Sequence, residues 1–316
     1  MKKSAVIFPG QGAQYVGMGA GLLESQSGRE IMDRACDVLG FNLSELCLNG
    51  PAQDLTRTDN SQVALFTLGY MGYSLLKESM PSDWRPDYVA GLSLGEFTAL
   101  AVAGVFSFED GLRLVRKRGE FMINACRERE GAMASVIGAD RDTLSAVIED
   151  IRKTGKVINM ANLNCPGQIV VSGEKDAVVA TADRLEADGF RVVMLQVSGA
   201  FHSPLMESAQ KKLADVVDSI TFNDPKIPVV CNCDAGIKTK ADDIKRAIID
   251  QMVSSVLWED SVNLMIANGV ELFIEPGCGK VLKGLLRRIN RKMTCVSIEK
   301  PDNISSVTSV LCQEVG

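Results

Sequence analysis

The feature that most constrains the fold is a Gly-Leu-Ser-Leu-Gly pentapeptide at residues 91–95. The short segment that leads into it, residues 86–91, is predicted to be a buried strand, and residues 95–103 are predicted to be a helix. A strand, a sharp turn and a helix form a nucleophile elbow, which exposes a serine at the end of a sheet. Glycines permit such a turn because they carry no Cβ. The pattern predicts a nucleophile at Ser93, and the alternative is a tight turn whose serine only caps the helix.

The chain contains a single histidine, His202. A serine hydroxyl is a weak nucleophile at neutral pH and needs a base to take its proton. Histidine is suited to that task by its ordinary pKa. If Ser93 is a histidine-activated nucleophile, His202 is therefore its partner. Ser203 and Pro204 provide a cap and a first-turn proline, which predicts that His202 lies directly before a helix.

Composition excludes several other classes of protein. A net charge of −6 argues against a nucleic-acid-binding surface. The nine cysteines follow no framework spacing and no signal peptide is recognisable, so a cytoplasmic protein is expected. No apolar run reaches the roughly 18 residues that a membrane span needs. Cys231 and Cys233 are separated by one residue only, which is not a common zinc spacing, and no metal is expected.

Strand and helix signals alternate along residues 1–128 and again along residues 198–316. Such alternation predicts an α/β fold with a mostly parallel sheet covered by helices. Residues 129–197 instead follow the order βαββαβ, with short strands expected at 157–159 and 168–171, which is the ferredoxin-like arrangement. Because this segment separates Ser93 from His202, it is expected to pack beside the main domain as one wall of a cleft.

A glycine-rich loop, residues 10–14, follows the first predicted strand. It lacks the spacing of a phosphate-binding loop. In elbow enzymes the oxyanion hole combines the amide after the serine with one from another loop. Leu94 is the candidate for the first amide and Gln11 for the second. An ordinary strand-to-helix turn is the equally open alternative for this loop.

Six motifs occur in an order that is typical of one family. They are Phe-Pro-Gly-Gln-Gly-Ala-Gln at 8–14, Gly-Leu-Ser-Leu-Gly-Glu at 91–96, Arg-Gly at 118–119, Asn-Leu-Asn-Cys-Pro-Gly-Gln at 162–168, Gly-Ala-Phe-His-Ser at 199–203 and Pro-Gly-Cys-Gly-Lys-Val-Leu at 276–282. On these residues the chain resembles, over nearly its full length, the bacterial malonyl-CoA:acyl carrier protein transacylases. These belong to the acyltransferase family of fatty acid and polyketide synthesis. The resemblance implies an α/β-hydrolase-like large subdomain, residues 1–128 and 198–316, and a ferredoxin-like insert, residues 129–197.

The resemblance also implies a reaction. Malonyl would pass from malonyl-CoA to Ser93, with His202 as base, and then to the phosphopantetheine thiol of holo acyl carrier protein, a transient partner. Coenzyme A would be released, and no cofactor, metal or membrane would be involved. A monomer is expected. The family orients its histidine with a main-chain carbonyl, which maps here to Gln251, so a dyad is expected and not a Ser-His-Asp triad.

Arg118 would bind the free malonyl carboxylate, because a guanidinium offers two parallel donors to such a group. From the sequence alone, a solvated helix face shared with neighbouring cations is the stronger alternative. The resemblance further places Leu92, Asn162 and Phe201 in the substrate pocket, with Phe201 leaving little room for a branched acyl group. Leu92 is a departure, since many family members carry histidine there, and any hydrogen bond from that histidine is lost.

The carrier protein is acidic, and so is this chain, so docking requires a local basic face. The best candidate is a predicted helix near the C-terminus whose cations recur at helical spacing. These cations are Lys283, Arg287, Arg288, Arg291 and Lys292. A solvated helix end that complements its own dipole is the alternative, and residues 113–117 are the next candidate surface.

Two other functions remain open on the sequence. A serine hydrolase would use the same elbow but would transfer the acyl group to water. A non-catalytic scaffold would not need an intact Ser93 and His202. A carboxylate-binding arginine and the absence of a clear acid partner for the histidine favour the transferase.

Overall fold

The larger lobe is built on a six-stranded sheet in the computed structural model, which describes residues 2–197 and 199–311. The strand order is β10-β9-β1-β2-β7-β8, and every neighbouring pair is parallel except β7 and β8. The strands are β1 (Ser4–Phe8), β2 (Tyr88–Gly91), β7 (Val229–Val230), β8 (Ile237–Lys238), β9 (Leu272–Pro276) and β10 (Thr294–Ile298). The predicted mostly parallel sheet is therefore present, and its central strand is β1.

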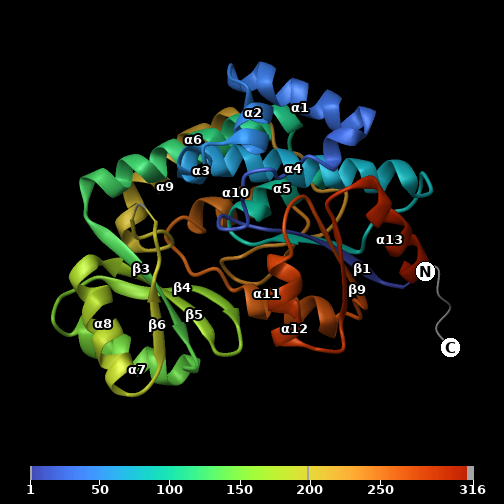
Figure 1. The fold of residues 1–316 in the computed structure, drawn as a ribbon. Helices are drawn as coiled ribbons and strands as arrows, with labels where there is room; N and C mark the ends of the chain where they lie inside the picture. Colours follow the sequence, from blue (N-terminus) through green and yellow to red (C-terminus); the bar gives the residue numbers. More distant parts are fainter. Residues whose placement is uncertain (1, 198, 312–316) are drawn as a thin grey trace.

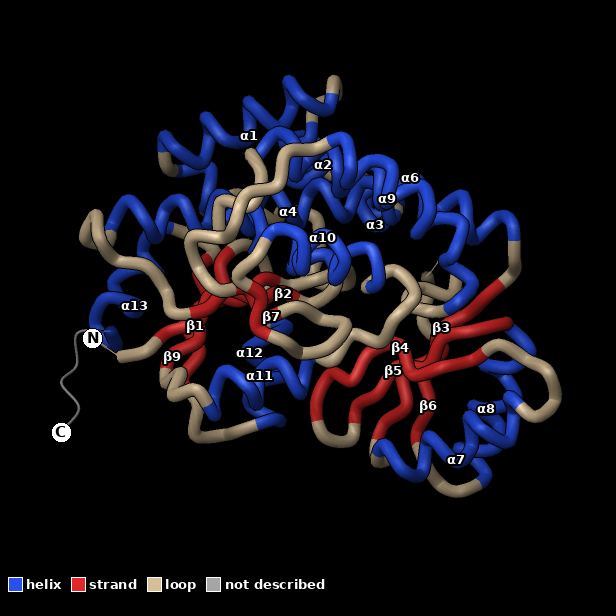
Figure 2. The backbone as a smooth tube through the Cα atoms, turned by 180° about the vertical axis from the view of Figure 1, so that it is seen from behind, coloured by secondary structure: helices blue, strands red, loops and turns tan. Residues whose placement is uncertain are grey.

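Helices cover both faces of this sheet (Figure 2). They are α1 (Gln26–Leu39), α2 (Leu43–Asn49), α3 (Ala52–Thr56), α4 (Thr58–Ser79), α5 (Leu94–Val102), α6 (Phe108–Glu128), α9 (Glu207–Ser219), α10 (Ala241–Asp250), α11 (Trp258–Ala267), α12 (Val281–Ile289) and α13 (Ile304–Leu311). Successive side chains of a strand point to opposite faces. Val6 and Phe8 of β1 accordingly join a core with α4 and α5, whereas Ala5 and Ile7 join a core with α11 and α12.

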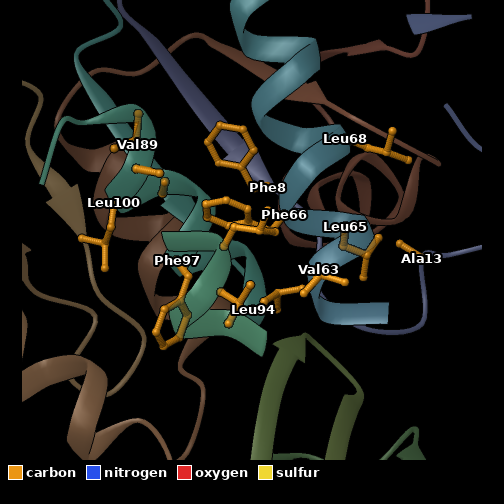
Figure 3. Close-up of a cluster of buried hydrophobic side chains, with 14 of the residues drawn as sticks. Phe8, Ala13, Val63, Leu65, Phe66, Leu68, Val89, Leu94, Phe97 and Leu100 are labelled. Atoms are coloured by element: carbon orange, nitrogen blue, oxygen red, sulfur yellow. The ribbon is translucent and has the colours of Figure 1, made fainter. Parts of the chain in front are cut away.

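The larger core lies directly behind the predicted nucleophile. Phe8, Phe66 and Phe97 are fully buried in it, and Leu94 lies beside them (Figure 3). Each fully buried side chain of this size contributes about 1.5–3 kcal/mol to the free energy of unfolding. The apolar side chains of α5 therefore anchor its first turn in the core. This anchoring also fixes the position of the preceding turn, which contains Ser93.

A second sheet lies apart from the first, at the lower left of Figure 1. Its strands are β3 (Gly131–Ile137), β4 (Ile158–Cys165), β5 (Gln168–Glu174) and β6 (Arg191–Met194), and its helices are α7 (Arg141–Arg152) and α8 (Lys175–Ala187). The order β4-β5-β3-β6 with antiparallel neighbours is the ferredoxin-like arrangement that the sequence predicts. Apolar side chains of α7 and α8 pack on one face of this sheet.

Some details differ from the sequence-based expectations. The strand expected at 157–159 is β4 and continues to Cys165, because it pairs with β5 along most of its length. The short elements α2, α3, β8, β10 and α13 were not predicted. The second sheet falls inside the predicted insert, but residue 198, the predicted start of the returning segment, lies outside the described residues. Among the residues that the structure describes, no helix combines the length and apolar character that crossing a bilayer requires.

Candidate active site

Ser93 lies in a strained turn between β2 and α5. Its φ of 50° falls in the left-handed region, where non-glycine residues are rare and often functional. Glycine is required on both sides of it. A Cβ on Gly91 would lie 1.9 Å from the carbonyl carbon of Gly95, and a Cβ on Gly95 would lie 2.0 Å from the carbonyl oxygen of Phe8. The turn is thus packed against β1 and has the geometry of a nucleophile elbow.

This packing predicts that alanine destabilises the protein at Gly95, and a second glycine, Gly284, provides the control. Gly95→Ala should lower the free energy of unfolding by about 3 kcal/mol, because the new methyl group overlaps backbone that cannot move aside. Gly284→Ala, in α12, meets nothing within 4 Å and should raise it by roughly 0.5–1 kcal/mol, the usual gain of alanine in a helix. Urea denaturation measures both values, and equal midpoints for the two variants would contradict this view of the elbow.

The structure brings Ser93 and His202 together. The Oγ atom of Ser93 lies 2.8 Å from Nε2 of His202. The other ring nitrogen, Nδ1, lies 2.8 Å from the main-chain oxygen of Gln251. A carbonyl oxygen can only accept, so Nδ1 carries the hydrogen and Nε2 is free to accept the serine proton. His202 also has a positive φ of 57° and precedes a short 3-10 helix, Pro204–Met206, that is capped by Ser203.

The imidazole is neutral at physiological pH. Burial, together with the nearby positive charge of Arg118, lowers the pKa of His202 to about 4. A base must be unprotonated before the reaction, and this environment keeps it so. No carboxylate contacts the ring in the hydrogen bonds of residues 2–197 and 199–311. The arrangement is a serine–histidine dyad held by a main-chain carbonyl.

Arg118, from α6, lies beside this dyad and is almost fully buried, with 1% of its surface exposed. Its Nη2 atom donates to Ser93 Oγ at 3.0 Å and to Gln251 Oε1 at 3.0 Å, and Nη1 donates to Gln62 Oε1 at 2.9 Å. The guanidinium also lies over the ring of Phe97. Burial lowers the pKa of Arg118 to about 10, which leaves it protonated at neutral pH.

Arg118 is therefore not part of a solvated helix face, and that alternative is wrong. Its Nε atom is buried without a hydrogen-bond partner. None of the ion pairs within the described residues includes it. A buried cation that no carboxylate contacts directly is costly. An anionic group on a substrate would compensate this charge.

These groups open onto a cavity of about 340 Å³ between the two lobes. The face of the second sheet that is not covered by helices forms one wall, with Met133, Asn162 and Val170 among its side chains. The large lobe supplies the opposite wall. The sequence-predicted residues that line the cavity are Gln11, Leu92, Ser93, Leu94, Arg118, Asn162, Phe201 and His202. The expectation that the insert forms a cleft wall agrees with this placement.

The two residues predicted to supply the oxyanion-hole amides, Gln11 and Leu94, both line the cavity. Leu94 is the first residue of α5, and a first-turn amide has no partner within its own helix. Gln11 lies in the loop after β1, which passes so close to the elbow that a Cβ on Gly10 would lie 2.4 Å from the Leu92 carbonyl oxygen. Gly10 thereby allows the loop to bring Gln11 to the cavity that Ser93 enters.

Sequence reasoning missed several polar residues behind the dyad. Asn232 accepts the Ser93 main-chain N–H at 2.7 Å through Oδ1 and donates to the Gly91 carbonyl at 2.7 Å through Nδ2, so it braces both ends of the turn. Gln62 and the side chain of Gln251 hold Arg118, and Glu96 lies behind them. Asn232 lies between Cys231 and Cys233, a spacing that drew attention to the cysteines and carried no signal for the asparagine. Within the described ranges, no cluster of three or more histidine, cysteine or acidic residues could hold a metal ion.

The predicted basic face lies on α12 and the segment that follows it. All five of its cations are exposed, and none takes part in an ion pair within the described part of the chain. Arg288 donates to Gln168 Oε1 at 2.7 Å, and Gln168 lines the cavity. This surface therefore adjoins the cavity. Arg113 and Lys117, on the alternative surface, are instead paired with Asp110 and Glu120.

Comparisons with known proteins agree on one family. A family model described as "Acyl transferase domain" matches residues 6–291. The malonyl CoA-acyl carrier protein transacylase of Bacillus subtilis (strain 168) is 42% identical over 316 residues, which cover 99% of each chain. The solved structure of the corresponding transacylase from Coxiella burnetii superimposes with a TM-score of 0.95 at 32% identity, over 99% of this chain and 98% of that one. A malonyl-transacylase solved in complex with a type II PKS acyl-carrier protein gives a TM-score of 0.93 at 34% identity, over 98% and 100% of the two chains.

Proposed function

The chain belongs to the acyl transferase family, among the malonyl CoA-acyl carrier protein transacylases, and we propose that it transfers malonyl from malonyl-CoA to the phosphopantetheine thiol of acyl carrier protein. The observation that carries the proposal is the position of Arg118. A buried guanidinium without an ion pair lies within hydrogen-bonding distance of the nucleophile. It is suited to an acyl group that ends in a carboxylate, as malonyl does.

The first half of the reaction forms an ester on the enzyme. Ser93 Oγ attacks the thioester carbonyl while His202 Nε2 takes the hydroxyl proton. The carbonyl oxygen becomes an oxyanion, which the main-chain amides of Gln11 and Leu94 stabilise. The carbon–sulfur bond then breaks, His202 returns the proton to the sulfur, and coenzyme A leaves. The product is malonyl-Ser93.

The second half reverses these roles with a different thiol. The phosphopantetheine thiol of the carrier protein gives its proton to His202 and attacks the ester carbonyl. The same amides hold the oxyanion, and the ester bond to Ser93 breaks as His202 reprotonates Oγ. Both half-reactions use one site, so the kinetics are ping-pong. The proposal involves no bound cofactor and no metal, and the protein acts as a monomer.

The pocket residues set the choice of acyl group. Arg118 selects the carboxylate, and the main-chain oxygen of Gln251 keeps His202 in its reactive tautomer. Phe201 is almost fully buried at the cavity wall, where its ring limits the space for a branched acyl chain. Leu92 and Asn162 complete the surface around the acyl group. Leu92 offers no hydrogen bond at the position where the family resemblance implies a histidine in many members, so the dyad works without an accessory donor there.

A mass measurement tests the ester. Wild-type protein mixed with malonyl-CoA should gain one malonyl group per chain, and peptide mapping should place it on Ser93. Ser93→Ala should gain none, because it lacks the hydroxyl that His202 activates. An adduct on another residue, or one that persists in Ser93→Ala, would overturn the assignment.

We propose that the carrier protein docks on the α12 basic face, which consists of Lys283, Arg287, Arg288, Arg291 and Lys292 and adjoins the cavity. Charges at the rim of an interface act mainly on the association rate and are screened by salt. Lys283 and Arg287 are one helical turn apart, and neither is among the residues that line the cavity. Changing both to glutamate should raise KM for the carrier protein by about tenfold at low salt. Acylation of Ser93 by malonyl-CoA should not change.

A matched variant controls for net charge. Lys153→Glu with Arg184→Glu makes the same change in charge, directly after the end of α7 and on α8. The apolar sides of these two helices pack on the far face of the second sheet. That variant should leave KM for the carrier protein close to the wild-type value. Equal effects from the two pairs, or no effect from the α12 pair, would place the docking surface elsewhere.

A further inference from the structure

Glu96 is a fully buried carboxyl group that the proposed reaction does not use. It lies in the first turn of α5, three residues after Ser93. Its Oε2 atom accepts two hydrogen bonds, from the main-chain N–H of Asn232 at 2.8 Å and from Nε2 of Gln251 at 3.0 Å. Its Oε1 atom has no partner among the described residues. Burial raises the pKa of Glu96 to about 7, against the opposing effect of these hydrogen bonds.

The hydrogen bond between Glu96 and Gln251 is one of those that set the orientation of the Gln251 side-chain amide. An amide side chain has a donor end and an acceptor end. Nε2 of Gln251 donates to Glu96 Oε2 at 3.0 Å, to the main-chain oxygen of Ser93 at 3.0 Å and to Asn232 Oδ1 at 3.3 Å. Oε1 of Gln251 therefore points toward Arg118 Nη2, at 3.0 Å. Rotated by 180°, the amide would place its own hydrogens against the guanidinium, which has only donors. The carboxyl group of Glu96 and the main-chain oxygen of Ser93 together exclude the orientation that would push Arg118 away.

Arg118 is in this way held by neutral amides, Gln62 on one side and Gln251 on the other. A carboxylate in direct contact would form a bidentate pair with the guanidinium and compete with the substrate's carboxylate for it. Glu96 acts from one residue further away. Its charge still favours the charged form of Arg118, but no carboxylate of the described residues pairs with the guanidinium, which leaves that role to an anionic acyl group.

We propose that Glu96 is a positioning residue for Arg118, which it aims at the carboxylate of the acyl group by fixing, together with the main-chain oxygen of Ser93, the side-chain amide of Gln251. The inference rests on the proposed function, since it assigns Glu96 to the acyl selectivity of the same site. It predicts that losing the acceptor at Glu96 impairs transfer of a carboxylated acyl group more than transfer of an uncharged one.

Two substitutions of similar size separate the acceptor from the volume of the side chain. Glu96→Gln keeps an oxygen for Asn232 and Gln251, and its NH2 group can take the place of Oε1, which has no protein partner. Glu96→Leu removes the acceptor. Steady-state kinetics of both variants are measured with malonyl-CoA and with acetyl-CoA, after circular dichroism has shown that they are folded.

Glu96→Leu should lower kcat/KM for malonyl-CoA by about tenfold or more, the usual effect of losing a hydrogen bond to a charged group, and mainly through KM. The value for acetyl-CoA should fall much less, so the malonyl-to-acetyl ratio drops. Glu96→Gln should keep that ratio within about threefold of wild type. An equal loss with both substrates, or an unchanged ratio in Glu96→Leu, would overturn the inference.

A second variant covers the case in which Glu96→Leu does not fold. Gln251→Met keeps the main-chain carbonyl that holds His202 but removes the amide, and it should show the same drop in the malonyl-to-acetyl ratio. An unchanged ratio in this variant would also overturn the inference.

The wild-type protein tests the proposed function separately. If it takes up no malonyl on Ser93, the proposed function fails, whereas normal uptake with unchanged ratios in the variants overturns only the role of Glu96.

Discussion

Replacing His202 with alanine should slow the acylation of Ser93 by about 10²–10⁴-fold, the usual effect of losing a general base. Nε2 of His202 is 2.8 Å from Ser93 Oγ. The chain has no second histidine that could substitute for it. The rate of malonyl incorporation after rapid mixing with malonyl-CoA measures the loss directly, without a contribution from the carrier protein.

The control for this variant concerns binding. His202→Ala should still bind malonyl-CoA with an affinity close to wild type, because Arg118 and the cavity walls remain. Calorimetric titration in the Ser93→Ala background, with and without the His202 change, checks that expectation. Acylation at more than a tenth of the wild-type rate would show that His202 is not the base.

Arg118→Ala should lower kcat/KM for malonyl-CoA by about 100-fold or more, whereas transfer from acetyl-CoA should hold or rise. A hydrogen-bonded charge pair that is shielded from water is worth far more than a surface pair. Acetyl lacks the carboxylate and loses nothing when the guanidinium is removed. Competition between the two thioesters for Ser93, followed by the masses of the two adducts, measures the change in selectivity.

A second variant, Arg118→Lys, separates the effect of the charge from that of the donor geometry. Lysine keeps the charge but not the fork of parallel donors, so it should recover only part of the malonyl preference. Equal losses with malonyl and acetyl in Arg118→Ala would assign Arg118 to the support of Ser93 and Gln251, and the choice of substrate would then lie with other residues.

The sequence predicts the two reacting residues for local reasons. The elbow is encoded in a few consecutive positions, and Gly91 and Gly95 are required by contacts that any such turn makes. The single histidine leaves one choice of base. The roles of Arg118 and of the Gln251 carbonyl are predicted only by the family resemblance. In the sequence alone, a cation in a charged helix looks like its neighbours, and a main-chain oxygen is present in every residue. Burial of Arg118 is a tertiary property, fixed by α4, α5 and α10 together.

The supporting polar network could not be read from the chain because its members are distant in sequence. Gln62 lies on α4, and Asn232 follows β7, more than 130 residues after Ser93. One signal was available. Glu96 is a charged residue in an otherwise apolar helix that is buried on all sides, and a carboxyl group in such a place needs a specific partner.

The most direct test of the account follows the malonyl group from enzyme to carrier. Malonyl-enzyme is isolated by gel filtration, mixed with holo acyl carrier protein, and both proteins are weighed by intact-mass spectrometry. The account predicts that the malonyl mass leaves the enzyme and appears on the carrier thiol, with little free malonate, and that apo carrier protein receives none. Release of free malonate at the same rate with and without the holo carrier would identify a hydrolase and contradict the account.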